Sequence, residues 1–537
     1  MNVAPASWKL SSGATGPTRR LAVTLVIAVA STLGLSVVAR AQKGAPPPEG
    51  AAPPAEPPTE EATGPETEAQ AEEATTKEVD PEIFNTALAD FYNERYPEAA
   101  AGFWGYIHFG EGASAENAEW AQYFLAECLR KLGFWHAAVQ YYYTVAKTRS
   151  RPEILPDALG RLEAISRRRP FSEALVFEDL VYDSEFGFLP PFLNDWVQYV
   201  QGLYDYKNGL VEWAERHFSA IQKTSPYSLR ALYVQAVYAL KNNKDEVAIA
   251  LFDTIVGSAI EAPDIKNQAN LSLARLLFET KQYADALKIY DNVIQNDLSF
   301  EQAELLLEKA WTYYFLGDRR KAMGLLHSLE APSYEHFYLP DSYVLRGLIL
   351  KDLCHFIPAK RVIRAFRFRY QRSLDLLHRR VDMRKIGGIL DAATQEGGIG
   401  RRTQLLRTLE AERKLIEKFD TYWEDVELDQ HLRKIYDLEI REQSRLWNIE
   451  FEKSADRSAL DLLEIEEQVG LLDYELGLDI FKRLKAEGAK HTVEEPLVIP
   501  YDSANVYYEF DTEYWNDELH SYKYFINSRC FEMEGGK

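Results

Sequence analysis

The chain has 537 residues, of which 46% are hydrophobic and 12% aromatic, and its formal charge at pH 7 is −22. This composition supplies enough apolar side chains for a large core, which excludes a wholly disordered protein, and the length is sufficient for two or three domains. The negative charge argues against a general attraction to nucleic acid or anionic lipid, so any anion-binding role has to be local.

Residues 1–41 have the features of an export signal. They contain no Asp or Glu, carry Arg19 and Arg20, and continue as an apolar run over residues 21–38. The small residues that follow suit a signal peptidase, so we expect cleavage before Gln42 and a location in the periplasm or cell envelope. The alternative is an inner-membrane anchor formed by residues 21–38, because this run approaches the ~20 apolar residues that span a bilayer. No later stretch is apolar enough to cross a membrane.

Residues 42–80 form a segment rich in proline, alanine and glutamate that contains no aromatic residue. Such a segment buries too little apolar surface to order itself. It is predicted to be a disordered linker, acting either as a tether or as a passive leader.

From residue 81 to about 370, the sequence repeats a pair of small residues twelve positions apart. Successive pairs recur at nearly regular intervals, except for one interval of double length that contains a degenerate unit centred on Ala174. A large apolar residue such as Phe218 follows the second small residue by one helical turn, so the two share a face. This pattern predicts about eight helical hairpins. Their predicted core positions are Ala126, Ala138, Gly202, Ala214, Phe218, Ala236, Ala248, Ala274, Ala286, Ala310, Ala322, Gly347 and Ala359.

The repeat resembles the tetratricopeptide repeat (TPR). The segment WVQYVQGLYDYKNGLVEWAERHFSAIQKTSP carries the small Gly202, a turn glycine at Gly209, Ala214, Phe218 and a final Pro226. The resemblance covers a little over half of the chain, although most units are slightly longer than the standard unit of the family. It implies an all-α, TPR-type hairpin solenoid.

TPR proteins hold peptides or partner helices on the concave wall that the first helices of their hairpins line, and the resemblance implies the same here. Stacked hairpins form such an extended concave surface because each unit contacts mainly its neighbours. The candidate partner-binding residues, chosen by position, are Tyr199, Tyr206, Arg230, Tyr233, Asn270, Arg275, Tyr313, Tyr314 and Arg346.

Residues 371–495 are predicted to be a helical extension without the repeat. Residues 360–414 contain fifteen Lys or Arg and six acids. This basic region either binds an acidic partner segment, an anionic glycan or phospholipid head groups, or is neutralised within the chain by its acidic stretches. The glycine-rich residues 385–402 are predicted to be a hinge. Residues 403–487 fit two or three long packed helices or a short coiled coil.

The sequence contains no recognisable catalytic, cofactor-binding or metal-binding motif. It has no His-Glu-x-x-His, Cys-x-x-Cys or Gly-x-Ser-x-Gly. The three cysteines, Cys128, Cys354 and Cys530, lie at remote spacings that suggest no disulfide framework, although Cys530 is free to pair with Cys354 or with another chain.

The tail, residues 496–537, is aromatic and unlike the rest of the chain. Trp515, Leu519, Tyr522 and Ile526 follow at intervals of four, three and four, which predicts one stripe of a short helix. An array of hairpins needs a cap at its end. We therefore expect this stripe to fold back onto the helical body as a latch, with a docking surface for a partner as the alternative.

The sequence as a whole favours a non-enzymatic scaffold of the bacterial cell envelope. Its partners would be envelope proteins or peptide segments, as part of an outer-membrane biogenesis, secretion, pilus or motility assembly. The alternative is a module that binds the cell wall or an anionic glycan through residues 360–414. An enzyme with its active site in the C-terminal part is the third class, for which no motif argues.

Overall fold

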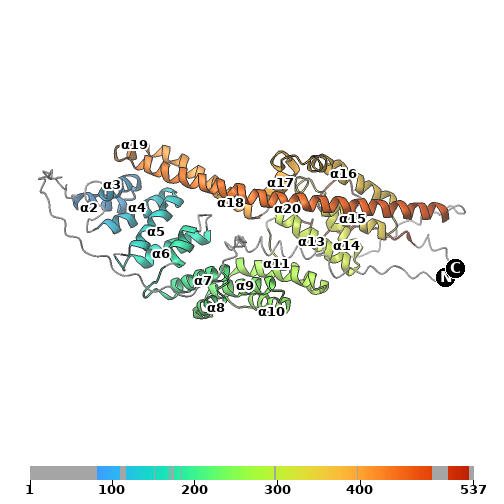
Figure 1. The fold of residues 1–537 in the computed structure, drawn as a ribbon, viewed down its shortest axis with the longest axis horizontal. Coiled ribbons are helices and arrows are strands. Elements are labelled where there is room, and N and C mark those ends of the chain that lie inside the picture. The colour runs from blue at the N-terminus through green and yellow to red at the C-terminus, as the bar shows by residue number, and fades with distance from the viewer. Residues whose placement is uncertain are drawn as a thin grey trace, which may run out of the picture. The chain divides into compact units, whose positions relative to one another are not determined.

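The computed structural model describes residues 81–108, 117–149, 151–168, 171, 174–182, 184–295, 298–395, 397–486, 506–508 and 510–530. The predicted export signal and linker lie outside these ranges. The described residues form helices and turns without a strand, which confirms the predicted all-α helical-hairpin fold (Figure 1). Among them, no helix has both the length and the apolar character that a bilayer crossing requires.

Consecutive helices pair into antiparallel hairpins along the chain. The pairs are α2 (Pro81–Tyr92) with α3 (Tyr96–His108), α4 (Ala118–Leu132) with α5 (Trp135–Thr148), α7 (Pro191–Lys207) with α8 (Val211–Ala220), α9 (Pro226–Lys241) with α10 (Asp245–Val256), α11 (Pro263–Glu279) with α12 (Tyr283–Tyr290), α13 (Phe300–Leu316) with α14 (Arg319–Ser328), and α15 (Asp341–Asp352) with α16 (Phe356–His378). In the degenerate unit, α6 (Leu155–Arg168) is followed by a π-helix, η2 (Ala174–Tyr182).

The small residues of the repeat allow the two helices of a hairpin to approach closely. All thirteen predicted core positions are buried. A Cβ atom added to Gly202 would lie 2.5 Å from the ring of Phe218 on the other helix of the same hairpin. A larger residue at this position would therefore force the hairpin apart.

Seven hairpins turn through one residue in the left-handed conformation, always five positions before the second alanine of the repeat. These residues are Glu94, Gly133, Gly209, Asn243, Lys281, Gly317 and Cys354. The next residue donates its N–H to a carbonyl of the first helix, as from His355 to Leu350 over 2.7 Å. This hydrogen bond closes the helix end in the manner of a Schellman motif.

The C-terminal helices follow the last hairpin. They are η3 (Met383–Lys385), α17 (Gly387–Gln395), α18 (Gly397–Leu415), η4 (Ile416–Lys418), α19 (Asp420–Trp423), η5 (Glu424–Val426) and α20 (Leu428–Ala486), which has 59 residues. Helices α18 and α20 run antiparallel, since Arg402 binds Glu450 and Thr403 accepts a 2.9 Å hydrogen bond from Trp447. The glycines of the predicted hinge lie at the start of α17 and α18, so most of this segment is helical, and its action as a hinge stays a prediction.

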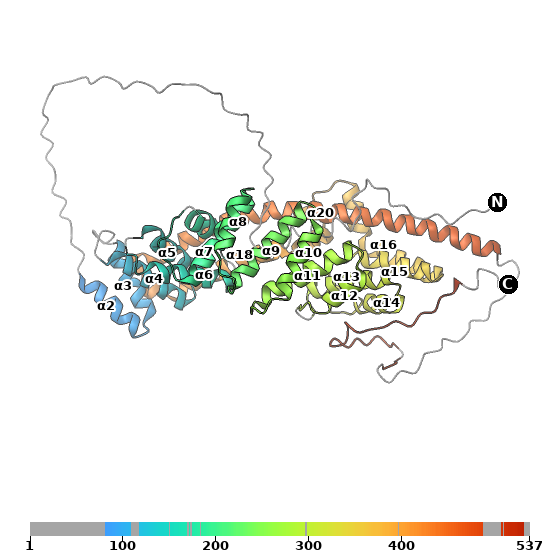
Figure 2. The same cartoon turned by 90° about the horizontal axis from the view of Figure 1, so that it is seen from below.

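The chain forms two compact units, one of which contains Glu163–Ala411 and Tyr436–Lys537 and the other the first hairpins and Glu412–Ile435. In the smaller unit, Trp423 donates to the carbonyl of Pro97 over 3.0 Å, which ties α19 to α3. In the larger unit, the inner face of α20 packs on the last hairpins. Both views show α20 continuing past α15 and α16 (Figures 1 and 2).

Candidate functional site

Four of the nine candidate partner-binding residues are buried inside the repeat array. Tyr199, Tyr206, Tyr233 and Asn270 are all covered by neighbouring side chains. The hydroxyl of Tyr233 lies 2.9 Å from that of Ser272 on the first helix of the next hairpin. The ring centres of Tyr199 and Tyr206 lie 5.6 and 4.8 Å from those of Tyr227 and Tyr238 on the next hairpin, so the three tyrosines contribute to packing between hairpins.

Two of the candidate arginines form ion pairs with the following hairpin. Arg230 pairs with Asp264, and Arg275 makes a bidentate contact of 2.6 and 3.0 Å with the carboxylate of Glu308. A second carboxylate, that of Glu304, lies 3.3 Å from Arg275, and burial raises the pKa of Glu304 to about 7 despite this arginine. The cluster couples α11 to α13.

The remaining three candidates also have partners within the chain. Tyr314 donates a 2.9 Å hydrogen bond to Asp352, and Arg346 pairs with Glu330 and donates to a backbone carbonyl of α14. The ammonium group of Lys321 lies 4.9 Å from the ring centre of Tyr313. The first helices thus use their polar side chains to hold neighbouring hairpins together, which leaves less of this wall available to a partner than its position in the repeat implied.

The described part of the tail crosses α14 and reaches the end of α15. Tyr524 donates its N–H to the carbonyl of Arg320 over 3.0 Å, and Ser328 donates to the carbonyl of Leu519 over 2.5 Å. Leu519 is only 2% exposed. A Cβ atom at Gly324 would overlap the carbonyl of Tyr522, so the tail passes directly over this glycine.

The predicted helix in the tail is wrong. Residues 516–521 form turns, and the chain from 522 to 529 is neither helical nor paired as a strand. The backbone N–H groups of this segment donate to carbonyls in α14 and at the end of α15, and not to the carbonyl four residues earlier as they would in a helix. The close contact at Gly324 also requires a backbone that is not enclosed by side chains, as it would be in a helix. Of the four predicted latch residues, Leu519 is buried, Tyr522 and Ile526 pack at the edge of the core, and Trp515 is exposed.

Aromatic side chains of the tail surround His327 on α14. The ring centres of Phe510, Tyr514, Tyr522 and Tyr524 lie 4.4 to 6.3 Å from that of His327. Burial, and secondarily the charge of Arg346, lower the pKa of His327 to about 4. The imidazole is therefore neutral at pH 7, which suits the aromatic rings around it, while its Nδ1 lies 3.3 Å from the carboxylate of Glu330.

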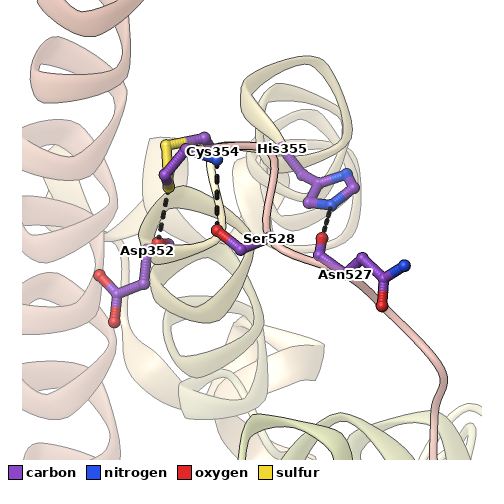
Figure 3. The surroundings of a disulfide bond; sticks show 6 residues. Asp352, Cys354, His355, Asn527 and Ser528 are labelled. Carbon is purple, nitrogen blue, oxygen red and sulfur yellow. Dashed lines mark hydrogen bonds between the residues drawn. A yellow bond between two sulfur atoms is a disulfide. The ribbon is translucent and has the colours of Figure 1, made fainter. Parts of the chain in front are cut away.

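A disulfide joins the tail to the turn of the last hairpin (Figure 3). It links Cys530 to Cys354, whose Cα atoms are 5.2 Å apart. Beside it, a ring nitrogen of His355 lies 2.7 Å from the carbonyl of Asn527. The third cysteine, Cys128, is buried with a free thiol. Of the two pairings that the sequence allowed for Cys530, the structure has the one within the chain.

Acidic residues of α20 neutralise part of the basic region. Lys360 and Arg367 both contact Asp473, while Arg402 and Arg384 pair with other carboxylates of α20. The reading in which these charges are compensated within the chain therefore holds for at least these four basic residues. It does not account for the outer face of α16.

The outer face of α16 carries a mixed basic and apolar stripe. It consists of Ile357, Arg361, Arg364, Phe368 and Arg372, which we call the α16 stripe. Phe368 is 94% exposed and Ile357 67%. Within the described chain, the three arginines have no ion-pair partner. The intervals of four, three, four and four place all five side chains on one face. Asp375 continues this face and accepts a hydrogen bond from Gln371.

Sequence reasoning identified the arginines of this stripe but missed its apolar members. The available signal was the helical spacing of Ile357 and Phe368 relative to the buried Ala359, Ile363 and Phe366. The residues of α16 that carry the repeat pattern define its inner face, and Phe368 lies opposite them. Among the described residues, no group of His, Cys, Asp and Glu is arranged to hold a metal ion.

Comparisons with known proteins give limited information about this chain. No protein-family model matches it, and no curated protein matches it in sequence. Among the solved structures that match is the apo form of RapI, with a TM-score of 0.29 and 11% sequence identity, over 68% of this chain and 97% of that one. A likeness at these values does not establish a family, so membership of the TPR family stays a prediction.

Proposed function

We propose that the chain is a non-enzymatic scaffold of the bacterial cell envelope that binds an acidic segment of a partner protein through the α16 stripe. The observation that carries this proposal is the exposure of Phe368 between Arg364 and Arg372 in a protein whose net charge is −22. Aromatic residues and arginine are the types that dominate binding energy at protein interfaces. In the isolated chain these side chains are exposed to solvent.

The chemistry of the stripe defines the partner. Three arginines on one helix face favour a segment with carboxylates spaced along one face, and each guanidinium can donate two parallel hydrogen bonds to one carboxylate. Ile357 and Phe368 require apolar side chains among those carboxylates. Because long-range charge attraction mainly increases the association rate, binding should weaken with added salt, and the apolar contacts should set the lifetime of the complex.

The hairpin array serves in this proposal as a rigid support for the stripe. The inter-hairpin contacts of Arg230, Tyr233, Arg275 and Tyr314 hold successive units in register. We assign the array to the TPR type on the twelve-residue spacing of its small residues and its left-handed turns. The concave wall then contributes to partner binding only where its side chains are free of these contacts.

Export to the envelope is supported by two features. The N-terminal segment, residues 1–41, has the pattern of a cleavable signal. The disulfide between Cys354 and Cys530 is of the kind that persists in oxidising compartments such as the bacterial periplasm. A scaffold in this location would act within an assembly for outer-membrane biogenesis, secretion, pili or motility.

The test is recovery of a partner by cross-linking and affinity purification from intact envelopes. The wild-type chain should recover a defined protein with an acidic segment, and the recovery should fall with salt. The variants Phe368→Ala and Arg361→Glu/Arg364→Glu should each reduce recovery about tenfold or more, as expected for central interface residues. The control is Arg407→Glu, an exposed arginine on α18, which should leave recovery unchanged.

The same variants distinguish the second candidate function, binding of the cell wall or an anionic glycan. It is favoured by Arg379, Arg380 and Lys385, which continue the exposed positive charge beyond α16. Retention on purified wall that depends on the arginines and not on Phe368 would support it. Equal recovery of the same protein by wild type and both stripe variants would refute the proposed protein-binding site.

A further inference from the structure

The C-terminal part of α20 has two apolar faces, of which the described chain covers only one. Leu472 and Leu476 belong to the buried core. On the opposite side, Leu471, Tyr474, Leu478 and Phe481 are exposed, and Tyr474 and Phe481 are each about two-thirds exposed, at 66% and 65%. Their intervals of three, four and three are those of a helix-pairing seam. We call these four residues the α20 stripe.

Two glycines line one edge of the α20 stripe. Gly470 and Gly477 lie seven residues apart inside the helix, and a Cβ atom on either would meet nothing within 4 Å. Glycine is among the least favourable residues inside a helix. At Gly202 and Gly347, by contrast, the missing side chain makes room for a neighbour in the same chain. Nothing in the described chain uses the room beside Gly470 and Gly477.

We propose that the α20 stripe binds the α20 stripe of a second copy of the chain, with the two helices antiparallel. If the twofold axis passes between residues 475 and 476, Gly477 of each copy faces Tyr474 of the other. In the same register, Gly470 faces Phe481. Each glycine thus provides room for an aromatic ring of the other copy, which makes the surface complementary to itself, as a twofold interface requires.

Charge also favours the antiparallel arrangement. The exposed Glu467 precedes the stripe, beside Glu466, which contacts His378. Lys482 follows the stripe, and it is largely exposed and lies 3.5 Å from Asp479. Antiparallel pairing brings the acidic end of one helix to the basic end of the other, whereas parallel pairing places like charges together. The stripe covers about three helical turns, or roughly 16 Å. Such a short interface predicts a weak dimer that depends on protein concentration.

Sedimentation equilibrium of the purified chain tests the proposal. The wild type should dimerise at tens of micromolar, and Leu478→Lys should weaken the dimer at least about tenfold. The matched control is Leu438→Lys, which replaces a similarly exposed leucine on the same helix outside the stripe. A wild type that stays monomeric, or a control that weakens the dimer as much as Leu478→Lys, would overturn the proposal.

The variant Gly477→Leu tests whether the dimer requires the two helices to approach closely at residue 477, without unfolding the monomer. Leucine has the higher helix propensity, and a Cβ atom at residue 477 meets nothing within 4 Å in the described chain, so the monomer should become more stable to heat. It would nevertheless block the ring of Tyr474 from the other copy, so the dimer should be lost. A Gly477→Leu chain that dimerises as well as the wild type would refute the proposed register.

The orientation is measured by the distance between spin labels attached to a cysteine at position 467 in both copies. The antiparallel register places the two label sites about 25 Å apart, whereas parallel helices place them about 10 Å apart. The shorter of these two distances would refute the antiparallel dimer.

Discussion

Replacing Gly324 with alanine should release the tail from α14. Alanine is preferred to glycine inside a helix by up to about 1 kcal/mol, so the substitution alone would stabilise α14. Its Cβ atom, however, would overlap the carbonyl of Tyr522 and lie 2.7 Å from the Cα of Lys523. Backbone atoms cannot rotate away as a side chain can, so the tail has to move.

The magnitude follows from the contacts that are lost. Exposing Leu519 costs about 2 kcal/mol, and the hydrogen bonds from Ser328 and Tyr524 contribute about 1 kcal/mol each. Better helix propensity in α14 and the conformational entropy regained by the freed tail offset part of this. We therefore expect the free energy of unfolding to fall by about 1–3 kcal/mol in Gly324→Ala.

Hydrogen exchange measures the release directly, because the amide of Tyr524 should lose its protection. Chymotryptic cleavage within residues 510–526 should become faster at the same time. The matched control is Gly160→Ala on α6, where a Cβ atom meets nothing within 4 Å and stability should rise slightly. If Gly324→Ala also became more stable and the amide of Tyr524 stayed protected, the tail would not rest on Gly324 as described.

Three further predictions concern the disulfide and two titrating sites. Cys530→Ser and Cys354→Gly both remove the disulfide and should each lower the free energy of unfolding by about 2–4 kcal/mol. Cys354→Gly should lose about 1 kcal/mol less in urea unfolding, because glycine adopts the φ of 59° at this turn without strain. Since the pKa of His327 is about 4, below its ordinary 6.5, the folded chain binds fewer protons there than the unfolded chain. The free energy of unfolding should thus fall as the pH drops from 6.5 to 4. In His327→Phe, the midpoint of urea unfolding should fall less steeply over this pH range than in the wild type. Arg275→Met leaves two carboxylates without their counter-ion and should cost about 3–5 kcal/mol at pH 8. At pH 5 the loss should be smaller, because Glu304, with a pKa near 7, is already protonated, and equal losses at both pH values would contradict this.

The hairpin array follows from the sequence because its determinants are local. A small residue and an alanine twelve positions apart describe one hairpin, and the same spacing recurs in each unit. The contacts between hairpins carry a second signal that the sequence reading did not use. Arg230 and Asp264 are 34 residues apart, Arg275 and Glu308 are 33, and Tyr314 and Asp352 are 38. A complementary polar residue one repeat further along indicates a partner inside the array.

The nine candidate partner-binding residues show that a residue's position in the repeat does not determine whether it is available to a partner. The repeat places them on the first helices, and the structure agrees with that placement. Their availability depends on whether a neighbouring hairpin already uses them, which is a property of residues a full repeat away. Phe368 shows the opposite case, since it lies outside the repeat pattern and is 94% exposed. Departure from the pattern was the better indicator of a free surface.

The tail could not be predicted from its periodicity because its partners lie elsewhere in the chain. Intervals of four, three and four also arise when an extended segment presents occasional large residues to a helix. In this tail, Leu519 is buried while Trp515 remains exposed, which one helical stripe would not produce. The small size of Gly324 was the complementary signal, but it could be recognised only once the crossing segment was known.

The placement of Cys354, by contrast, follows from the repeat once its register is known. Cys354 lies five positions before Ala359, at the left-handed turn position that glycine occupies at Gly133, Gly209 and Gly317. A residue there lies at the end of a hairpin and not between its two helices, so a covalent partner has to come from a segment that passes that end. Cys128 lies inside a first helix, two residues after a core alanine, and its side chain is enclosed. Within one chain that leaves Cys530, and this pairing requires the tail to return to the last hairpin whatever secondary structure it adopts. The sequence alone left pairing with another chain open.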